Sequence, residues 1–451
     1  MKNLRFILLI AGLLSLSGCG LYKKYERPHT EFADSLYRRL PEAKDTVSIA
    51  SVSWQDFFTD PVLKEWIDLG LKNNTDLNVA RFKVEEAEAA LMAARGAFLP
   101  GVSFGANGGT DFGGGTDFKA NVSASWEVDI FGSLTNAKRK AAAAVEQSVA
   151  YRQAVQTQLV ASIANTYYTL LMLDEQFRVS QRTYENWTEN IRTMEALKRA
   201  GKTNEAAVLQ AKANQLNVQG SMKELEQKII ETENSFSSLL GIVPMTIRRG
   251  HLNEQNFPLE LSQGVPAQLL SRRPDVKEAE MALAQAFYST AQARSAFYPK
   301  LNLSGALGWT AAGKSFDPRS FFTNLAASLT QPVFNKRALK ANLKKSEAQQ
   351  KEALYKFRQS ILDAGVEVNN ALVQWQIAQE MQTTDHQQVV HLQAAVWNTR
   401  LLMKHGLTNY LEVLTAQKTL LQAELAEASD KFAQIQGIIN LYHALGGGYE
   451  D

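Results

Sequence analysis

The sequence has very little of what enzymes and metalloproteins use. Its 451 residues include one cysteine and six histidines, so neither an internal disulfide nor a cysteine-rich zinc site can form. The motifs GxSxG and HExxH, which mark serine hydrolases and zinc proteases, do not occur. Only His386 and His391 are close, and a spacing of five does not align them on one helical face. We therefore expect no enzyme, no metal site and no cofactor except a covalent lipid.

Long apolar runs and an excess of one charge are also missing. After the N-terminus, no hydrophobic run reaches the roughly 20 residues of a membrane-spanning helix. The chain has 48 basic and 46 acidic residues, and Lys2 and Arg5 lie in a segment that we expect to be removed. A nearly neutral mature chain gives no electrostatic case for nucleic-acid binding.

The single cysteine ends an export signal. The chain begins MKNLRFILLIAGLLSLSGC, a basic start, an apolar stretch and small residues, which is typical of secretion. LSGC also fits the bacterial lipobox, so residues 1–18 are predicted to be cleaved and Cys19 to become a lipid-bearing N-terminus. Several acyl chains hold a protein on a membrane where one would be marginal. The residue after the cysteine is Gly20 and not an Asp, which by resemblance to bacterial lipoproteins points to the outer membrane. The alternative is that Cys19 merely ends a signal peptide.

A nucleotide-binding motif is present without its context. Residues 308–315 read GWTAAGKS, the pattern of a phosphate-binding loop. In the preceding residues apolar and polar side chains alternate, as in a strand with one face in water and not in a buried parallel strand. Pro318 would interrupt the helix that a phosphate-binding loop requires after it. A Walker B lookalike ends at Asp174, inside a long helical stretch. We expect no nucleotide and assign GWTAAGKSFDPRS to a hairpin turn whose glycines serve turn geometry.

The chain contains two copies of one pattern. ARGAFLP at 94–100 returns as ARSAFYP at 293–299, an offset of 199, and AGKTNEAAVLQA at 200–211 returns as HGLTNYLEVLTA at 405–416, an offset of 205. Each copy has the order helix, strand, turn, strand, very long helix. A repeat of this size predicts two structurally equivalent halves.

Each copy carries two strands with one apolar side, expected near 100–108, 117–128, 300–310 and 320–332. Apolar and polar residues alternate along the second strand, and the other three strands show the same pattern. About 9 to 11 residues cross a bilayer as a tilted strand with one face to lipid. A soluble hairpin on a core is the alternative, but the export signal and the second copy favour a membrane sheet. The predicted lipid-facing residues are Val102, Phe104, Ala106, Phe118, Ala120, Val122, Ala124, Trp126, Val128, Leu301, Leu303, Leu307, Trp309, Phe321, Leu325, Ala327 and Leu329.

Two stretches without proline, 132–200 and 336–404, follow the hairpins, and each would be about 100 Å long as a helix. The return helices carry apolar residues at spacings of three and four, which predicts coiled-coil seams. These seams comprise Val218, Met222, Leu225, Ile229, Thr232, Phe236 and Leu239, and then Leu411, Leu414, Lys418, Leu421, Leu425, Ala428, Phe432, Ile435 and Ile439.

Four strands cannot close a barrel alone, because open edges in lipid leave backbone groups unsatisfied. The barrel must be shared between chains. Two copies would give eight strands and a filled interior, and three copies would give twelve strands and a lumen. The fold class is therefore mixed and mainly α, with two tandem repeats that each hold a transmembrane β-hairpin and long coiled-coil helices.

Several segments together resemble one family, the TolC-like outer-membrane efflux proteins, and in particular the lipoprotein subgroup of the NodT and OprM type. They are LYKKYERP, SWQDFFTDPVLKEWIDLGLKNNTDL, WEVDIFG, LLSRRPDVKEAE, ARSAFYPKLNLSG and GLTNYLEVLTAQ. The resemblance covers nearly the whole chain. It implies a homotrimer with a twelve-stranded barrel, a periplasmic α-helical barrel and a mixed α/β equatorial region from residues near 41–60, 241–268 and the C-terminus.

The resemblance also implies a function. The trimer would be a passive exit duct in the outer membrane, docked to a periplasmic adaptor and an inner-membrane transporter of the resistance-nodulation-division class. It would export drugs or other toxic small molecules; heavy-metal efflux and type I protein secretion are the alternatives. A structural coiled-coil spacer would explain the heptads but not the strands.

The predicted organisation has five parts. Residues 1–18 are the signal peptide and residues 19–53 the lipid-anchored N-terminal segment. The first repeat spans 54–240, a connector 241–265 and the second repeat 266–451.

The helix reversals RAGKTN and KHGLTN are predicted to contact the adaptor. Gly201 and Gly406 allow the left-handed conformation that ends a helix. The alternative is that both are simple turns. The predicted docking residues are Gly201, Thr203, Asn204, Gly406, Leu407 and Thr408.

The resemblance also places a periplasmic gate just after the second reversal. Glu412 and Thr415 match two positions where relatives often have aspartates, so this chain lacks the second carboxylate. Three copies of Glu412 near an axis would repel one another and favour a bound cation or a shared proton. Asn409 and Tyr410 would supply hydrogen bonds that hold the tips inward. The alternative is that Glu412 is a solvated coiled-coil residue.

Overall fold

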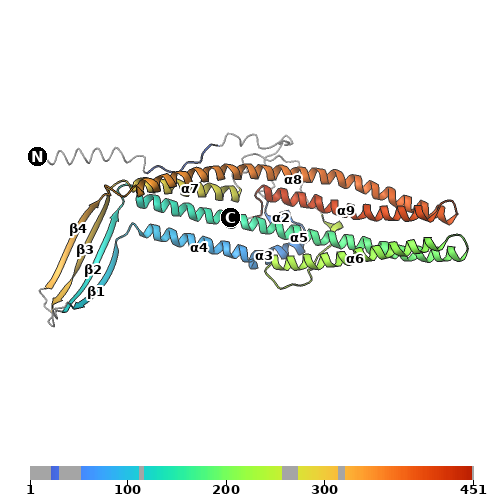
Figure 1. Ribbon diagram of the computed structural model, residues 1–451, viewed down its shortest axis with the longest axis horizontal. Coiled ribbons are helices and arrows are strands. Elements are labelled where there is room, and N and C mark those ends of the chain that lie inside the picture. Colours follow the sequence, from blue (N-terminus) through green and yellow to red (C-terminus); the bar gives the residue numbers. More distant parts are fainter. Residues whose placement is uncertain (1–21, 30–51, 111–115, 256–272, 313–319, 449–451) are drawn as a thin grey trace. The chain divides into compact units, whose positions relative to one another are not determined.

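The computed structural model describes residues 22–29, 52–110, 116–255, 273–312 and 320–448. These residues form long helices and one four-stranded sheet (Figure 1). The predicted mixed, mainly helical fold is confirmed. No helix in this part of the chain combines the length and the apolar character that crossing a membrane requires.

The two repeats have matching elements. The first holds α4 (Thr75–Gly96), β1 (Gly101–Thr110), β2 (Thr116–Val128), α5 (Ser133–Arg199) and α6 (Glu205–Leu239). The second holds α7 (Pro274–Ser295), β3 (Lys300–Ala312), β4 (Phe321–Thr330), α8 (Ala338–Lys404) and α9 (Tyr410–Ala444).

The lengths of the corresponding helices agree. Both α4 and α7 have 22 residues, α5 and α8 have 67, and α6 and α9 have 35. The starts of α4 and α7 are separated by the smaller of the two offsets found in the sequence, and those of α5 and α8, and of α6 and α9, by the larger one. The repeat in the sequence is therefore also a repeat in the backbone structure. Three short elements, α2 (Trp54–Phe57), α3 (Pro61–Asn73) and η4 (Leu252–Glu254), complete the described chain.

The chain forms two compact units that divide the long helices. One contains the described residues of Met1–Glu31, Ala80–Arg152 and Asp275–Ser360, and therefore the whole sheet. The other contains those of Phe32–Val79, Gln153–Pro274 and Ile361–Asp451, and therefore both helix reversals.

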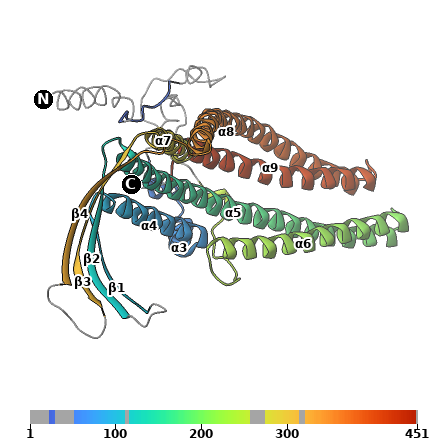
Figure 2. The ribbon, with the colours of Figure 1, turned by 60° about the vertical axis from the view of Figure 1, so that its left-hand side comes forward.

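In the first unit the strands follow the order β1-β2-β3-β4 and every pair is antiparallel (Figure 2). Each strand starts and ends within two residues of its expected range. The hairpins join through β2 and β3, where Val122 lies opposite Leu307. The two repeats therefore share one continuous sheet.

The motif GWTAAGKS is not wholly a turn, which corrects our expectation. Its first five residues, 308–312, belong to β3, and the rest lies outside the described residues. Gly308 serves close strand packing: a Cβ there would lie 2.3 Å from the carbonyl oxygen of Ala120. A glycine inside a strand often marks such an approach.

In the second unit an aromatic core surrounds the start of α3. The ring of Tyr442 stacks on Phe57 with centroids 4.0 Å apart. Asp60 caps α3 by accepting from the Val62 amide at 2.8 Å, with Pro61 in the first turn. The Tyr167 hydroxyl donates to the same carboxylate at 2.7 Å, which ties α5 to this core.

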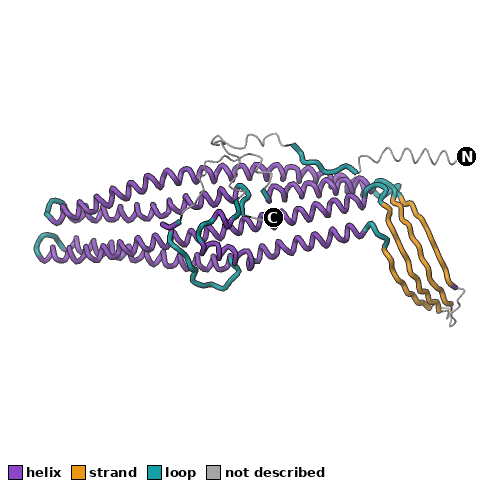
Figure 3. Tube along the Cα trace, turned by 180° about the vertical axis from the view of Figure 1, so that it is seen from behind, coloured by secondary structure: helices purple, strands orange, loops and turns teal. Residues whose placement is uncertain are grey.

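The same unit holds two helical hairpins, α6 along α5 and α9 along α8 (Figure 3). The predicted seam of α6 is confirmed where Val218, Leu225 and Phe236 are buried. The predicted seam of α9 is wrong near the reversal, where Leu411 and Lys418 are exposed. A helix of 3.6 residues per turn drifts from a strict heptad, and the buried residues there are Val413, Leu414 and Gln417.

Candidate functional site

One face of the sheet is apolar along all four strands. The register places Phe104 opposite Val122 and Trp309 opposite Phe321, and every predicted lipid-facing residue falls on this face. Leu325 is 89% exposed. A continuous apolar surface of this kind is rare on proteins in water and marks contact with lipid or protein.

The opposite face is polar. The hydroxyl oxygens of Ser103 and Ser123 lie 2.8 Å apart, and Lys300 pairs with Glu127 at 3.2 Å. This face also carries Asn107, Asp117, Lys119, Asn121, Ser125, Asn302, Ser304, Thr310, Asn324 and Ser328. Lipid on one side and water on the other is the arrangement of a membrane barrel wall.

Aromatic side chains lie near both ends of the apolar face. Toward the hairpin turns, the rings of Trp309 and Phe321 are 5.0 Å apart and Phe118 is close by in the register. Toward the helices, the indole N–H of Trp126 donates to the Phe98 carbonyl at 3.0 Å. Trp126 follows Phe118 by eight positions, about 27 Å along the strand. At the roughly 40° tilt of outer-membrane strands this is about 20 Å of height, close to their apolar band of about 25 Å.

Both edges of the sheet are unpaired within the described chain. β1 pairs with β2 and β4 pairs with β3, while β1 and β4 do not pair with each other. Unsatisfied backbone groups in lipid cost several kcal/mol each. The sheet therefore requires strands from other chains to complete a barrel.

The two helix reversals have the conformation that the glycines predicted. Gly201 has φ +69° and Gly406 has φ +74°. The following asparagines are helix caps: Asn204 accepts from the Ala207 amide at 3.0 Å, and Asn409 accepts from the Leu411 amide at 2.9 Å. Leu407 is 74% exposed at the second reversal, whereas Thr203 and Thr408 are partly buried.

The predicted gate residues are the N-cap of α9, Asn409, and three residues of its first turns. Glu412 and Thr415 are exposed and three residues apart, so they share a face. The Thr408 hydroxyl donates to the Glu412 carboxylate, and the Thr415 hydroxyl donates to the Leu411 carbonyl at 2.8 Å. Tyr410 packs against the apolar cluster around Trp187. The gating role itself stays a prediction.

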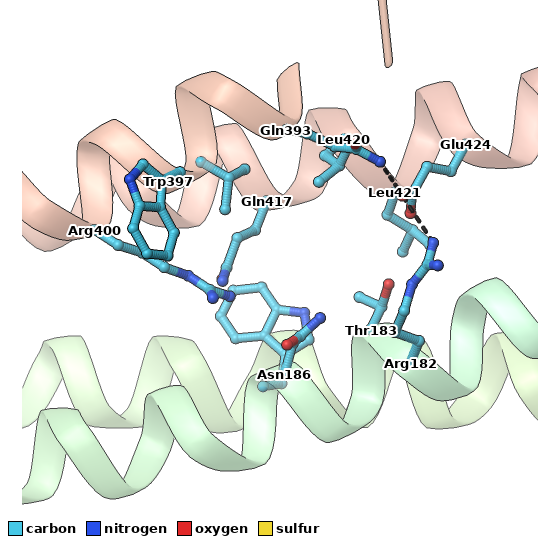
Figure 4. Close-up of a pocket in the computed structure, with 12 residues that line it drawn as sticks. Arg182, Thr183, Asn186, Gln393, Trp397, Arg400, Gln417, Leu420, Leu421 and Glu424 are labelled. Carbon is cyan, nitrogen blue, oxygen red and sulfur yellow. Dashed lines mark hydrogen bonds and ion pairs between the residues drawn. The ribbon is translucent and has the colours of Figure 1, made fainter. Parts of the chain in front are cut away.

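Polar side chains of α9 bind both α8 and the other hairpin at positions that the sequence reasoning missed (Figure 4). Arg182 of α5 pairs with Glu424 at 2.8 Å, and Gln393 of α8 donates to the same carboxylate at 3.4 Å. The Gln417 amide oxygen, turned toward Arg400, accepts from that guanidinium at 2.5 and 3.2 Å. These residues line a cavity of about 300 Å³.

A signal for these links was available. Gln417 and Glu424 are seven residues apart and both are buried, so they repeat as polar residues within the packed face of α9. A buried polar residue in a coiled coil often specifies its partner. In the same orientation of Gln417, the side-chain nitrogen of Asn190 on α5 lies 2.5 Å from the Gln417 oxygen.

An arginine that is buried or largely buried joins the two helices of each hairpin. Arg249 binds Asp174 of α5 at 2.5 and 2.9 Å and Glu233 of α6 at 2.5 Å. Burial lowers the pKa of Arg249, but the bonds to both carboxylates outweigh this and raise it. Asp174, the Walker B lookalike, is therefore an ion-pair partner.

The second arginine lies at the start of α7. Arg273 binds Glu367 of α8 at 2.6 Å and donates to the Ala444 carbonyl at the end of α9. His443 contacts the same carboxylate at 3.0 Å. Burial raises the pKa of Glu367, while the hydrogen bond from His443 and the charge of Arg273 lower it by more, to about 2.

Two carboxyl groups meet between α8 and α9. Burial, together with a hydrogen bond and the negative charge from Asp385, raises the pKa of Asp430 to about 7. The Oδ2 atom of Asp430 is buried and, without a proton between the two carboxyl groups, receives no hydrogen bond from the described residues. A proton shared by the two groups would supply that bond.

The segment after Cys19 contacts the sheet end of α5. The Tyr22 hydroxyl donates to the Ile130 carbonyl at 2.8 Å, and Arg139 donates to the Tyr22 carbonyl at 2.9 Å. Cys19 itself lies outside the described residues, three positions before Tyr22.

Comparisons with known proteins agree with this geometry. The family model "Outer membrane efflux protein" matches residues 66–242 and 265–447. The chain is 31% identical to the pyoverdine export outer membrane protein OpmQ of Pseudomonas putida over 430 residues, 91% of each chain. It is 29% identical to the cation efflux system protein CusC of Escherichia coli over 96% of this chain and 97% of the relative. The open-state crystal structure of the Neisseria gonorrhoeae MtrE outer membrane channel superimposes with a TM-score of 0.85 and 26% identity, covering 94% of this chain and 98% of MtrE.

Proposed function

This chain belongs to the outer membrane efflux protein family, and on that premise we propose that three copies form the exit duct of a pump whose inner-membrane transporter is of the resistance-nodulation-division class. Members of the family are outer-membrane channels of tripartite efflux systems and catalyse no reaction. This protein is such a channel. Three copies of the described sheet supply twelve strands, enough for a barrel with a lumen.

The open, two-edged sheet with one apolar face carries this proposal. A single copy leaves both edges unpaired, and closure by three copies pairs every strand. The test is native mass spectrometry of the purified protein together with single-channel recording in a planar bilayer. A trimer that conducts ions is expected. A stable monomer, or a trimer without conductance, would contradict the proposed duct.

We propose drugs and other toxic small molecules as the cargo, with the inner-membrane transporter selecting among them. Export of heavy-metal ions is the alternative that the similarity to CusC favours, and type I protein secretion is a further one. Coexpression with the cognate adaptor and transporter, followed by susceptibility profiling against antibiotics and metal salts, separates these cargoes. Protection against metal salts alone would replace the drug assignment.

We propose that Cys19 is the mature N-terminus and carries the lipid. Tyr22, three positions after Cys19, contacts the sheet end of α5, which supports a lipid anchor at this end of the sheet. Mass spectrometry of the N-terminal peptide should show a diacylglyceryl and an acyl group. An unmodified cysteine, or cleavage at another residue, would refute this assignment.

We propose that the two helix reversals dock the adaptor through Gly201, Thr203, Asn204, Gly406, Leu407 and Thr408. The exposed Leu407 supports this role, since nothing in the described chain covers it. Because Asn204 also caps α6, its substitution would weaken the reversal as well. Bulky residues at Leu407 and Thr408 should therefore be tested. They should abolish adaptor crosslinking and efflux without loss of trimer stability.

We propose that Glu412 forms the constriction, with Thr415 on the same face and with Asn409 and Tyr410 holding the turn. The exposure of Glu412 at the start of α9 supports this. Glu412→Ala, alone or with Asn409→Ala, should enlarge single-channel conductance and admit vancomycin without a pump. Unchanged conductance and cation dependence in an assembled trimer would place the constriction elsewhere.

A further inference from the structure

Positive charge gathers where the sheet meets the helices. The segment 336–345 carries five cations and no acidic residue, and 138–140 carries three. The larger sequence offset aligns Arg139 and Lys140 with Lys344 and Lys345, so both repeats have a basic pair at one position. We call the following set the basic band: Lys23, Lys24, Lys138, Arg139, Lys140, Lys336, Arg337, Lys340, Lys344 and Lys345.

The nearby carboxylates already have other partners. Asp129 caps α5 by accepting from the Thr135 amide at 2.8 Å. Glu127 pairs with Lys300 at 3.2 Å, and Glu347 pairs with Arg294 at 3.4 Å.

Within the described chain, none of the five cations of segment 336–345 forms an ion pair, and all five are exposed. The first turns of α5 and α8 contain no acidic residue. Cations near a helix N-terminus are electrostatically unfavourable there. The fold therefore offers no internal reason for this charge.

The order of side chains from β4 to α8 follows the layers of a bilayer leaflet. Leu329 ends the apolar face of β4, and Val333 and Phe334 follow with 98% and 84% exposure. The cations come next along the chain. Aromatic residues prefer the membrane interface, and long basic side chains extend their charged ends toward head groups.

We infer that the basic band binds the phosphate groups of anionic phospholipids in the leaflet next to the helices. The inference goes beyond the exit-duct function and rests on it only in placing the sheet in the membrane. Charge complementarity and continuity with the apolar face identify the partner as a lipid surface. Lys340 and Lys344 are four residues apart in α8 and share one helical face, and Arg337 directly precedes this helix.

The test uses the purified full-length trimer, stripped of lipid and titrated with phosphatidylglycerol or with phosphatidylcholine of the same acyl chains. Native mass spectrometry counts the retained lipids. The test variant is Arg337→Gln/Lys340→Gln/Lys344→Gln. The matched control is Lys351→Gln/Lys356→Gln/Arg358→Gln, three exposed cations farther along α8. A third variant, Arg337→Lys/Lys340→Arg/Lys344→Arg, keeps the charge.

The wild type, the control and the charge-preserving variant should retain phosphatidylglycerol in preference to phosphatidylcholine. The test variant should lose at least about tenfold in apparent affinity for phosphatidylglycerol, since each cation near an anionic surface contributes several-fold and salt screens part of this. Raising the salt concentration should weaken the preference.

Three outcomes would overturn the inference. Equal binding of both lipids would show that charge plays no part, while leaving the exit duct intact. Displacement of phosphatidylglycerol by inorganic phosphate at similar concentration would make the band a phosphate site. An equal loss of phosphatidylglycerol affinity in the matched control would show that the binding is not specific to the basic band. A wild-type protein that retains neither lipid and does not conduct would instead contradict the membrane duct itself.

Discussion

The two helical hairpins have equal lengths but different packed faces. The larger sequence offset aligns Ser180 and Leu225 of α5–α6 with Asp385 and Asp430 of α8–α9. Ser180 is buried and donates to the Gln176 carbonyl at 2.8 Å, and Leu225 is in the α6 seam. The second hairpin has two facing carboxyl groups at the same places. Equal backbone geometry therefore tolerates opposite side-chain chemistry.

The direction of the polar links also differs. The first hairpin is joined across its own reversal by the ion pair of Lys198 with Glu205 and by that of Lys212 with Glu195 at 2.8 Å. In the second hairpin, Glu424 forms an ion pair at 2.8 Å with Arg182 of the first hairpin. The two ion pairs of the first hairpin thus lie within it, whereas Glu424 of α9 is bound both by Gln393 of its own hairpin and by Arg182 of the other.

The largest effect is expected where each hairpin meets its arginine. Glu367→Gln removes the carboxylate from Arg273, whose side chain is 6% exposed, and loses the contact with His443. We expect a loss of about 2 to 3 kcal/mol in the free energy of unfolding, because a buried cation loses one of its partners, a carboxylate. Asp174→Asn should cost about 1 kcal/mol, since Glu233 still binds Arg249. Thermal unfolding of the trimers, followed by tryptophan fluorescence, measures both.

The pH dependence sharpens this prediction. The pKa of Glu367 is lowered to about 2 in the folded chain, so its stabilising contribution is present above the ordinary value near 4.5 and is lost as the pH falls toward 2. Glu367→Gln should flatten the stability curve in that range. Equal costs for Glu367→Gln and Asp174→Asn, with parallel pH curves, would contradict the proposed difference between the hairpins.

A second effect should appear where Asp385 and Asp430 replace Ser180 and Leu225. Because the pKa of Asp430 is raised to about 7, the folded state holds a proton that the unfolded state releases near pH 4. The stabilising effect of this proton is therefore greatest below about pH 4 and is lost as the pH rises through 7. The loss should be at most about 1 kcal/mol, since solvent screens the pair. Melting temperatures at pH 5 and pH 8 measure it.

Asp430→Asn should make the two melting temperatures more nearly equal, and Asp385→Asn should do the same because either change removes the repulsion. A wild-type protein that is more stable at pH 8 than at pH 5, with no change in either variant, would show that the two groups do not share a proton.

A third, smaller effect concerns the links from α9 to α5. Glu424→Gln should cost about 1 kcal/mol by weakening the bond to Arg182. Hydrogen exchange should rise in α9 more than in α6, because α6 does not depend on this carboxylate. Equal increases in both helices would remove the distinction between an internally joined hairpin and a tethered one. Lys223→Ala, at an exposed pair within α6, is the control.

The smallest effect is expected at the first reversal. Lys198→Ala breaks an ion pair with Glu205 in which both side chains are about half exposed. Exposed pairs contribute about 0.5 kcal/mol or less, so the melting temperature should barely change while hydrogen exchange in the reversal increases slightly. A large loss of stability would mean that this pair holds the whole hairpin.

Features with a short period could be predicted from the sequence. Alternation along β2 assigned each side chain to a face, and the two repeat offsets located the matching helices of the second repeat. The conformation of Gly201 and Gly406 followed from where the helices had to reverse. The alternation and the glycine reversals depend on neighbours a few residues apart, so the local sequence carries them. The matching helices followed from the internal repeat itself.

Only the tertiary structure decided which distant residues meet. It aligned β2 with β3, which made Gly308 a close-contact glycine within the sheet. It joined Arg249 to Asp174 and left Lys418 exposed while Gln417 became buried. Each outcome depends on packing between elements far apart in the chain. A heptad pattern shows that a helix has an apolar side, but the number and position of its partners determine how wide that side becomes and which polar residues find a bond within it.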